Sequence, residues 1–336
     1  MIPPLRPTFD AALRDVRAED SRFRVAAASR LAEPPPERRD AAVRGLLALA
    51  EDPVGTVREA AFESLGVLEA KEGLSFLIEA FEDPHAGARQ AAVLAAGRVA
   101  PERGADAIMR LLDDPRPEMR FAAIWTLSSL GEAHAPAVAQ GLEDPDEELR
   151  LVALQCLGDL GANDYVDSMA RLLDDPAHAV RFGAASALAA LGDRRGASTL
   201  RAALRRSDLA FPAAIGLGDL ADHDSADELR RLAQHRWRSP ILRAAAARAL
   251  VRLGDPLGIA VIRRLVRSWR IEARQYAVQL VGELGLTMLI PDLARALKRS
   301  RKAERPVYEA TLEELASQSP EAVALLAHLR QGDHPM

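Results

Sequence analysis

The stretch DDPAHAVRFGAASALAALG, residues 174–192, decides the fold of this chain, because variants of it recur along nearly the whole sequence. In it, Asp175-Pro176 is followed by Val180-Arg181 and then by small and apolar residues at helical spacing. Successive copies lie 29 to 34 residues apart, so ten units share a period of about 31 residues. Such a period indicates a repeat protein. The residues aligned on the arginine are Arg24, Arg58, Arg89, Arg120, Arg150, Arg181, Ala210, Arg243, Arg274 and Arg305.

Each unit carries the signals of two antiparallel helices. An Asp-Pro pair such as Asp52-Pro53 is expected to begin the second helix, because Asp caps free N–H groups and proline fits the first helical position. A shorter first helix is expected ahead of it, for example over Gly73–Glu82. Late small residues, such as Gly282 with Gly285, allow close helix approach or end the helix. The sequence therefore predicts an all-α fold, an α-solenoid (superhelix) of about ten two-helix repeats.

This pattern resembles the short HEAT-like repeat named for the phycobilisome lyases. That family has a first helix, an Asp, and a Val-Arg pair whose arginine follows the Asp by six residues, which Asp52 with Val57-Arg58 matches. Weaker copies extend from about Arg24 to Arg305. The resemblance implies binding of other macromolecules, and it makes a bilin-lyase-like, chromophore-binding subunit one alternative. It also implies a structural ladder between neighbouring repeats, formed by Asp52, Arg58, Asp83, Arg89, Asp114, Arg120, Asp144, Arg150, Asp175 and Arg181.

The seventh unit is degenerate, with Ala210 in place of the arginine and Phe211-Pro212 near the start of its second helix. Later units replace Asp-Pro with Ser239-Pro240, Ser268-Trp269 and Ser300-Arg301. We expect a single solenoid over 1–336. Its parts are an N-terminal cap repeat (1–36), regular acidic repeats (37–192), the degenerate repeat (193–222), basic repeats (223–318), and a C-terminal capping helix and tail (319–336).

Charge divides at the degenerate unit. Residues 1–190 carry 20 basic and 32 acidic side chains, whereas residues 191–336 carry 24 basic and 17 acidic ones. The basic half predicts an electrostatic contact with an acidic surface or with nucleic acid, because Arg beside Trp237 and Trp269 suits phosphates and bases. HEAT-like DNA glycosylases are a precedent by resemblance, and solvated arginines are the competing interpretation. The residues proposed for this contact are Arg230, Arg231, Arg236, Arg238, Arg263, Arg264, Arg267 and Arg270.

A second candidate surface lies on the second helices, which line the concave side in HEAT solenoids by resemblance. Residues one and five positions after the aligned arginine point away from the apolar stripe. In mid-chain most of these positions are apolar, and small residues such as Gly158, Ala189 and Gly218 are expected to form a flat floor beside them. This pattern predicts a groove for a partner peptide or helix, whereas packing between adjacent helices is the competing explanation. The groove residues are Phe121, Trp125, Leu151, Phe182, Phe211 and Ile215.

No motif for catalysis, metal binding or a cofactor is recognised in the sequence. The single cysteine, Cys156, is expected to be a buried, inert thiol. No apolar run reaches the ~20 residues of a membrane span, no signal peptide is visible, and the bias for Arg over Lys favours a GC-rich, bacterial genome. We therefore expect a cytoplasmic, non-enzymatic adaptor that binds a protein partner without a cofactor.

Overall fold

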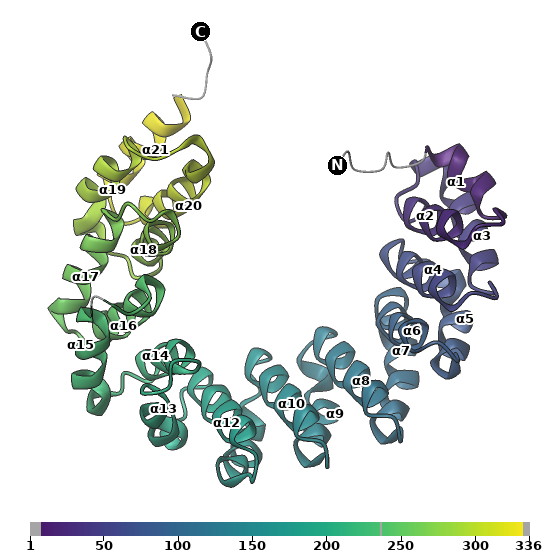
Figure 1. Ribbon diagram of the computed structural model, residues 1–336, viewed down its shortest axis with the longest axis horizontal. Helices are drawn as coiled ribbons and strands as arrows, with labels where there is room; N and C mark the ends of the chain where they lie inside the picture. Colours follow the sequence, from purple (N-terminus) through teal and green to yellow (C-terminus); the bar gives the residue numbers. More distant parts are fainter. Residues whose placement is uncertain (1–7, 236, 332–336) are drawn as a thin grey trace. The chain divides into compact units, whose positions relative to one another are not determined.

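The computed structural model describes residues 8–235 and 237–331. Within these residues the chain contains 21 α-helices, 12 short 3-10 segments and no β-strand (Figure 1). The chain is an all-α solenoid, as the period predicts. It consists of two compact units, which we call unit 1 (up to Met169) and unit 2 (from Ala170). The boundary falls inside α11 (Val166–Arg171).

Unit 1 is a stack of two-helix repeats. Its second helices lie side by side in one row, and the first helices α3, α7 and α9 each pack between two of them (Figure 1). The first helices are α1 (Phe9–Asp15), α3 (Arg39–Leu49), α5 (Leu74–Glu79), α7 (Pro101–Met109) and α9 (Ala135–Gln140). The second helices are α2 (Ser21–Leu31), α4 (Gly55–Val67), α6 (Ala86–Val99), α8 (Pro117–Ser129) and α10 (Glu147–Asp159).

Unit 2 repeats the same arrangement and ends with the expected extra helix, α21 (Pro320–Gln331), which packs on α20. Its first helices are α13 (Ala197–Ala203), α15 (Ala226–Gln234), α17 (Pro256–Val266) and α19 (Ile290–Leu297). The second helices, again in contact along one row, are α12 (His178–Ala190), α14 (Ala210–Asp219), α16 (Pro240–Arg252), α18 (Ile271–Glu283) and α20 (Arg305–Ala316).

The core of each unit is built from leucine and alanine. The leucine seven residues after the aligned position is fully buried in both units, as at Leu65, Leu127 and Leu217, and burying one such side chain contributes about 1.5–3 kcal/mol. Small residues bring neighbouring second helices close together. A Cβ atom on Gly66 would lie 2.9 Å from the Cβ of Ala95, so the helices approach more closely there than a larger side chain allows.

The second helices begin two residues later than the Asp-Pro pairs predicted. After Asp52-Pro53, α4 starts at Gly55, and the Asp52 carboxylate accepts a hydrogen bond from the Val54 N–H at 2.9 Å. Asp83 accepts from the His85 N–H at 2.8 Å in the same way. The prediction of Asp as helix N-cap and Pro as first helical residue is therefore wrong. The Asp instead closes an extended turn ahead of the helix, a position from which its carboxylate also reaches the preceding repeat.

Candidate functional site

The aligned arginines of unit 1 connect neighbouring repeats. Arg58 donates from Nε and Nη2 to the carboxylate of Asp83, both at 2.6 Å, and from Nη1 to the Asp52 carbonyl oxygen at 2.7 Å. Arg24 binds the Asp52 carboxylate in the same bidentate way, and Arg120 binds that of Asp144. Such charge-assisted, two-pronged contacts are the strong form of the ion pair.

One expected step of this ladder is different. Arg89 donates to the Glu118 carboxylate at 2.8 Å, whereas the Asp114 carboxylate accepts from Nε and Nη2 of Arg116. The expected ion pair between Arg89 and Asp114 is therefore wrong, because the guanidinium of Arg116, only two residues from Asp114, already binds that carboxylate.

Two further aligned arginines also bind their own turn. Arg150 donates to the main-chain oxygen of Asp144 at 2.8 Å, and Arg181 donates to that of Asp175 at 2.6 Å. The guanidinium group thus anchors the helix start to the turn before it in each of these repeats.

Burial and ion pairing act in opposite directions on the ladder aspartates. Burial alone would raise the pKa of Asp83, but the hydrogen bonds from Arg58 and from the His85 N–H outweigh it and hold the pKa below its ordinary value. The same balance lowers the pKa of Asp52 and of Asp144. These carboxylates are therefore charged structural anchors.

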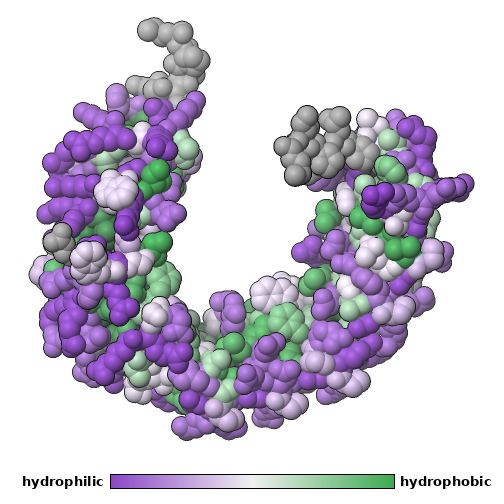
Figure 2. Space-filling model, viewed as in Figure 1, coloured by the Kyte–Doolittle hydropathy of each residue, from purple (hydrophilic) through white to green (hydrophobic). Residues whose placement is uncertain are grey.

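Of the predicted groove residues in unit 1, Phe121 and Trp125 lie together on the exposed face of α8. Their rings stack with centroids 6.4 Å apart and planes inclined by 5°, and the side chains are 43% and 45% exposed. Leu151 on α10 is half-buried. Apolar side chains gather over α8 and α10 on the face seen in Figure 2, so a surface patch is present in this unit.

The predicted groove residues of unit 2 are more engaged in packing. Phe182 and Ile215 are partly buried against the core of that unit. Phe211 remains 38% exposed, and its ring lies 6.2 Å from the ring of Tyr276, a residue that the sequence pattern did not select. The expected flat floor is wrong at Gly218, where a Cβ atom would lie 2.8 Å from the Ala249 Cα. Ala189 is likewise buried, because neighbouring helices fill this side.

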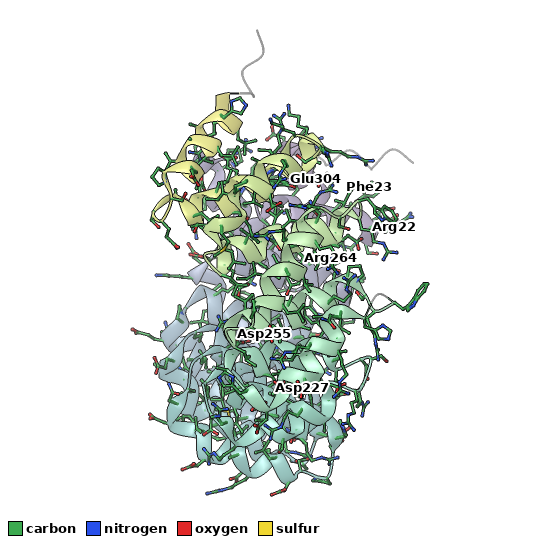
Figure 3. All side chains as sticks on the ribbon, turned by 90° about the vertical axis from the view of Figure 1, so that its left-hand side faces the viewer. Arg22, Phe23, Asp227, Asp255, Arg264 and Glu304 are labelled. Atoms are coloured by element: carbon green, nitrogen blue, oxygen red, sulfur yellow. The ribbon has the colours of Figure 1, made fainter. Side chains whose placement is uncertain are left out.

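The predicted basic residues fall into two groups. Arg230 pairs with Asp255 at 2.6 Å and with Asp227 at 2.8 Å, and Arg231 pairs with Glu228 at 2.9 Å. These arginines are therefore largely neutralised by first-helix carboxylates. Figure 3 looks onto the side of unit 2 that carries the labelled Asp227 and Asp255. Arg236 lies outside the described residues, and Arg238 is half-buried.

The second group surrounds the turn between α17 and α18. Arg263, Arg267 and Arg295 all contact the carboxylate of Asp292, which is buried on α19. The guanidinium of Arg270 lies 5.4 Å from the centroid of the Trp269 ring. Arg264, labelled in Figure 3, is exposed on α17, and no acidic partner is found for it within 8–235 and 237–331. Positive charge therefore exceeds negative charge here.

A cleft of about 480 Å³ opens at this turn. The side chains lining it include four arginines, Ser268 and Trp269. The arginines are Arg267, Arg274, Arg295 and Arg299. Arg274 also donates to Glu304 and, at 2.6 Å, to the Ser268 carbonyl oxygen. The sequence pattern had not selected Arg274 or Arg295 for binding, because the repeat alignment marks Arg274 as structural and Arg295 stands among solvated positions of a first helix.

Other candidate chemistry is sparse in the described part of the chain. No group of three or more His, Cys, Asp or Glu side chains lies close enough to hold a metal ion there. Cys156 is buried, and burial raises the pKa of its thiol, which keeps it protonated. Across the described helices, none combines the length and apolar character required to cross a bilayer.

Known proteins share the repeats of this chain. The family described as HEAT repeats matches the chain over residues 74–139 and 135–211. A chain in the complex of CpcE and CpcF of phycocyanin lyase from Nostoc sp. PCC7120 is 21% identical, with a TM-score of 0.53 over 68% of this chain and 94% of that one. YibA from Escherichia coli is 19% identical, with a TM-score of 0.55 over 72% and 92% of the two chains. No curated protein matches the sequence. The recognition of HEAT repeats is thus confirmed.

Proposed function

We propose that this protein is a non-enzymatic scaffold that binds the apolar side of a partner peptide or helix on the second helices of unit 1. HEAT repeats commonly mediate protein interactions, and the repeat architecture is consistent with that general role. The observation that carries the finer proposal is the stacked pair Phe121 and Trp125 on α8.

The exposure of this pair is the physical argument. Two aromatic rings four residues apart on one helix would ordinarily be placed toward the core, because each buries a large apolar area. Here the core side of α8 is occupied by Met119, Ala123 and Leu127, all fully buried, and the rings lie on the opposite face. Exposed aromatic clusters, Trp above all, are typical of the residues that dominate protein–protein binding energy.

Leu151 extends the patch to the neighbouring second helix α10, so an amphipathic helix could contact two repeats at once. In unit 2, the contacts expected at Phe182, Phe211 and Ile215 stay a prediction for that unit by itself. The exposed ring of Phe211 is the part of that set available to a partner.

The test is affinity capture from the native lysate with wild-type protein and with a Phe121→Ala/Trp125→Ala variant, followed by reconstitution with the identified partner. We expect the partner to bind wild type in high salt and to bind the variant about 30-fold or more weakly, since a central aromatic residue contributes about 2 kcal/mol or more. Phe23→Ala, which removes an exposed ring from α2 of the same unit, serves as the matched control and is expected to bind normally.

Unchanged capture by the double variant would refute the α8 patch as the binding site. The bilin-binding alternative stays a prediction, and it is checked by the visible absorbance that the purified protein would gain on mixing with a bilin.

A further inference from the structure

Three consecutive turns of unit 2 carry Trp, Arg or Ser where the turns of unit 1 carry Asp-Pro. The two positions lie six and five residues before the aligned arginine. Counted back from Arg243, Arg274 and Arg305, these positions ahead of α16, α18 and α20 hold Trp237-Arg238, Ser268-Trp269 and Arg299-Ser300. The sequence pattern had named Ser239-Pro240 and Ser300-Arg301 as the replacements, and these pairs lie two residues and one residue later. Because α16, α18 and α20 are successive members of one row, the three turns follow one another along the same edge of the unit.

The two tryptophans on this edge are almost fully exposed. Trp237 is 93% exposed and Trp269 is 83% exposed, and together they are two of the three tryptophans in the chain. A single exposed apolar residue is ordinary on a protein surface. Two indole rings at equivalent turns of consecutive repeats, each beside arginine, are more specific, because Trp is the side chain that loses most when left in water.

Trp269 lines two clefts at once. The first is the arginine-lined cleft of about 480 Å³ described above. The second, of about 440 Å³, extends from Trp269 to the preceding turn at Ser239-Pro240, and Arg270 and Arg301 line it together with Glu272. The second cleft therefore connects the α16 turn to the α18 turn, and the first reaches Arg299 at the α20 turn. The two clefts thus run from one turn to the next along one edge of unit 2.

The charge of this edge is strongly positive. Four guanidinium groups share two buried carboxylates, because Arg263, Arg267 and Arg295 surround Asp292 and Arg274 pairs with Glu304. A fifth, that of Arg299, lines the first cleft. Hydrophilic side chains also cover most of the visible surface over α15, α17 and α19 in Figure 2. An anion that enters the cleft therefore meets an excess of positive charge. The buried carboxylates already hold the arginine side chains in position.

We propose that this edge binds single-stranded nucleic acid, with phosphates in the arginine-lined cleft and unpaired bases stacked on Trp237 and Trp269. Arginine matches phosphate geometry by bidentate donation, and exposed aromatic rings provide stacking surfaces for any base. A duplex hides its base faces, so it would use only the arginines. An acidic protein would likewise leave the two rings without a role. This site uses unit 2 and other side chains than the protein-binding patch of unit 1, so each proposal can fail alone.

The test measures binding of a fluorescein-labelled oligo-dT of about 20 nucleotides, longer than a single-domain site, by fluorescence anisotropy and by quenching of Trp emission. We expect binding that weakens as salt rises from about 50 to 200 mM, because phosphate contacts release counterions. Trp269→Ala and Trp237→Ala should each weaken binding about tenfold, a typical cost of losing one stacked base. Trp269→Phe should retain most of the affinity because it keeps an aromatic ring.

Arg299→Ala removes one phosphate contact and should reduce the slope of log affinity against log salt by about 0.7. The matched controls are Phe23→Ala and Trp125→Ala, which remove exposed rings from unit 1 and should leave oligonucleotide affinity unchanged. Absence of oligo-dT binding at low salt would overturn the proposal, and so would binding that neither Trp variant weakens. Binding of poly-glutamate as tight as that of oligo-dT would also overturn it and would assign the edge to an acidic protein.

Discussion

The turn that precedes the second helix has different roles in the two units. In unit 1, the turns at Asp114-Pro115 and Asp144-Pro145 line a cleft of about 350 Å³ together with Asp113, Glu143 and Arg120, and Asp144 is an anchor of the inter-repeat ladder. In unit 2, the cleft at the corresponding place is lined by four arginines and Trp269. The same backbone feature thus presents opposite charge.

The difference follows from where each unit places its ion pairs. In unit 2 the carboxylates that pair with arginine lie outside the turn. Arg274 pairs with Glu304 in the 3-10 segment Lys302–Glu304, and Arg267 pairs with Asp292 on the first helix α19. Ser268 still closes its turn by accepting from the Arg270 N–H at 3.2 Å. Once the turn no longer needs an aspartate, its exposed positions are available for other side chains.

The largest effect is expected from Asp83→Ala in unit 1. This change leaves the mostly buried guanidinium of Arg58 without its carboxylate and the His85 N–H without its acceptor, so it should destabilise α4 and α6 by about 3 kcal/mol. Hydrogen exchange of the α4 and α6 amides measures the loss locally. Asp83→Asn retains an acceptor for His85 and should cost less, and equal protection in wild type and Asp83→Ala would contradict the anchoring role.

A smaller loss of stability in the same arginine–aspartate ladder is expected when the pH is lowered. Burial acts to raise the pKa of Asp52, Asp83 and Asp144, and the stronger hydrogen bonds from arginine and backbone N–H lower it overall. A carboxyl whose pKa is lower in the folded state contributes stability that is complete above its unfolded pKa, about 3.9. That contribution is lost as pH falls through the folded pKa.

We therefore expect α4, α6 and α8 to lose exchange protection below about pH 4. In the Asp83→Ala variant the acid sensitivity of the contact between α4 and α6 should be reduced, because one of the titrating groups is absent. Identical pH profiles of wild type and variant would exclude this aspartate as a source of the effect.

The smallest effect on stability is expected from Trp237→Ala, at the position that aligns with Asp83. Its side chain is 93% exposed and its ring makes no stacking or cation–π contact within the described residues, so the change in unfolding free energy should stay within about 0.5 kcal/mol. Thermal unfolding followed by circular dichroism checks this. A loss comparable to that of Asp83→Ala would show that the turns of the two units have the same structural role.

Much of the architecture could be predicted from the sequence because a repeat fixes its own neighbours. The period, the leucine of each second helix and the late glycines identify which faces must be buried, and contacts such as that of Gly66 with Ala95 follow from that pattern. The arginine-to-aspartate contacts, which came from the resemblance, are present at Arg24, Arg58 and Arg120. These features depend on residues a fixed number of positions apart.

What the tertiary structure alone decided depends on side chains far apart in the sequence. By local sequence alone, an Asp-Pro pair predicts the start of a helix. In the structure the Asp lies in a turn before the helix, where its carboxylate binds an arginine of the preceding repeat, as Asp52 binds Arg24. Local competition by Arg116 redirects Arg89 to Glu118. Likewise, the sequence determined that unit 2 is rich in arginine, while only the fold gathered Arg267, Arg274, Arg295 and Arg299 around Trp269. The sequence period determines which face of its helix a residue occupies, because it depends on spacing along the chain. Which charged side chains pair depends on how neighbouring repeats pack in space.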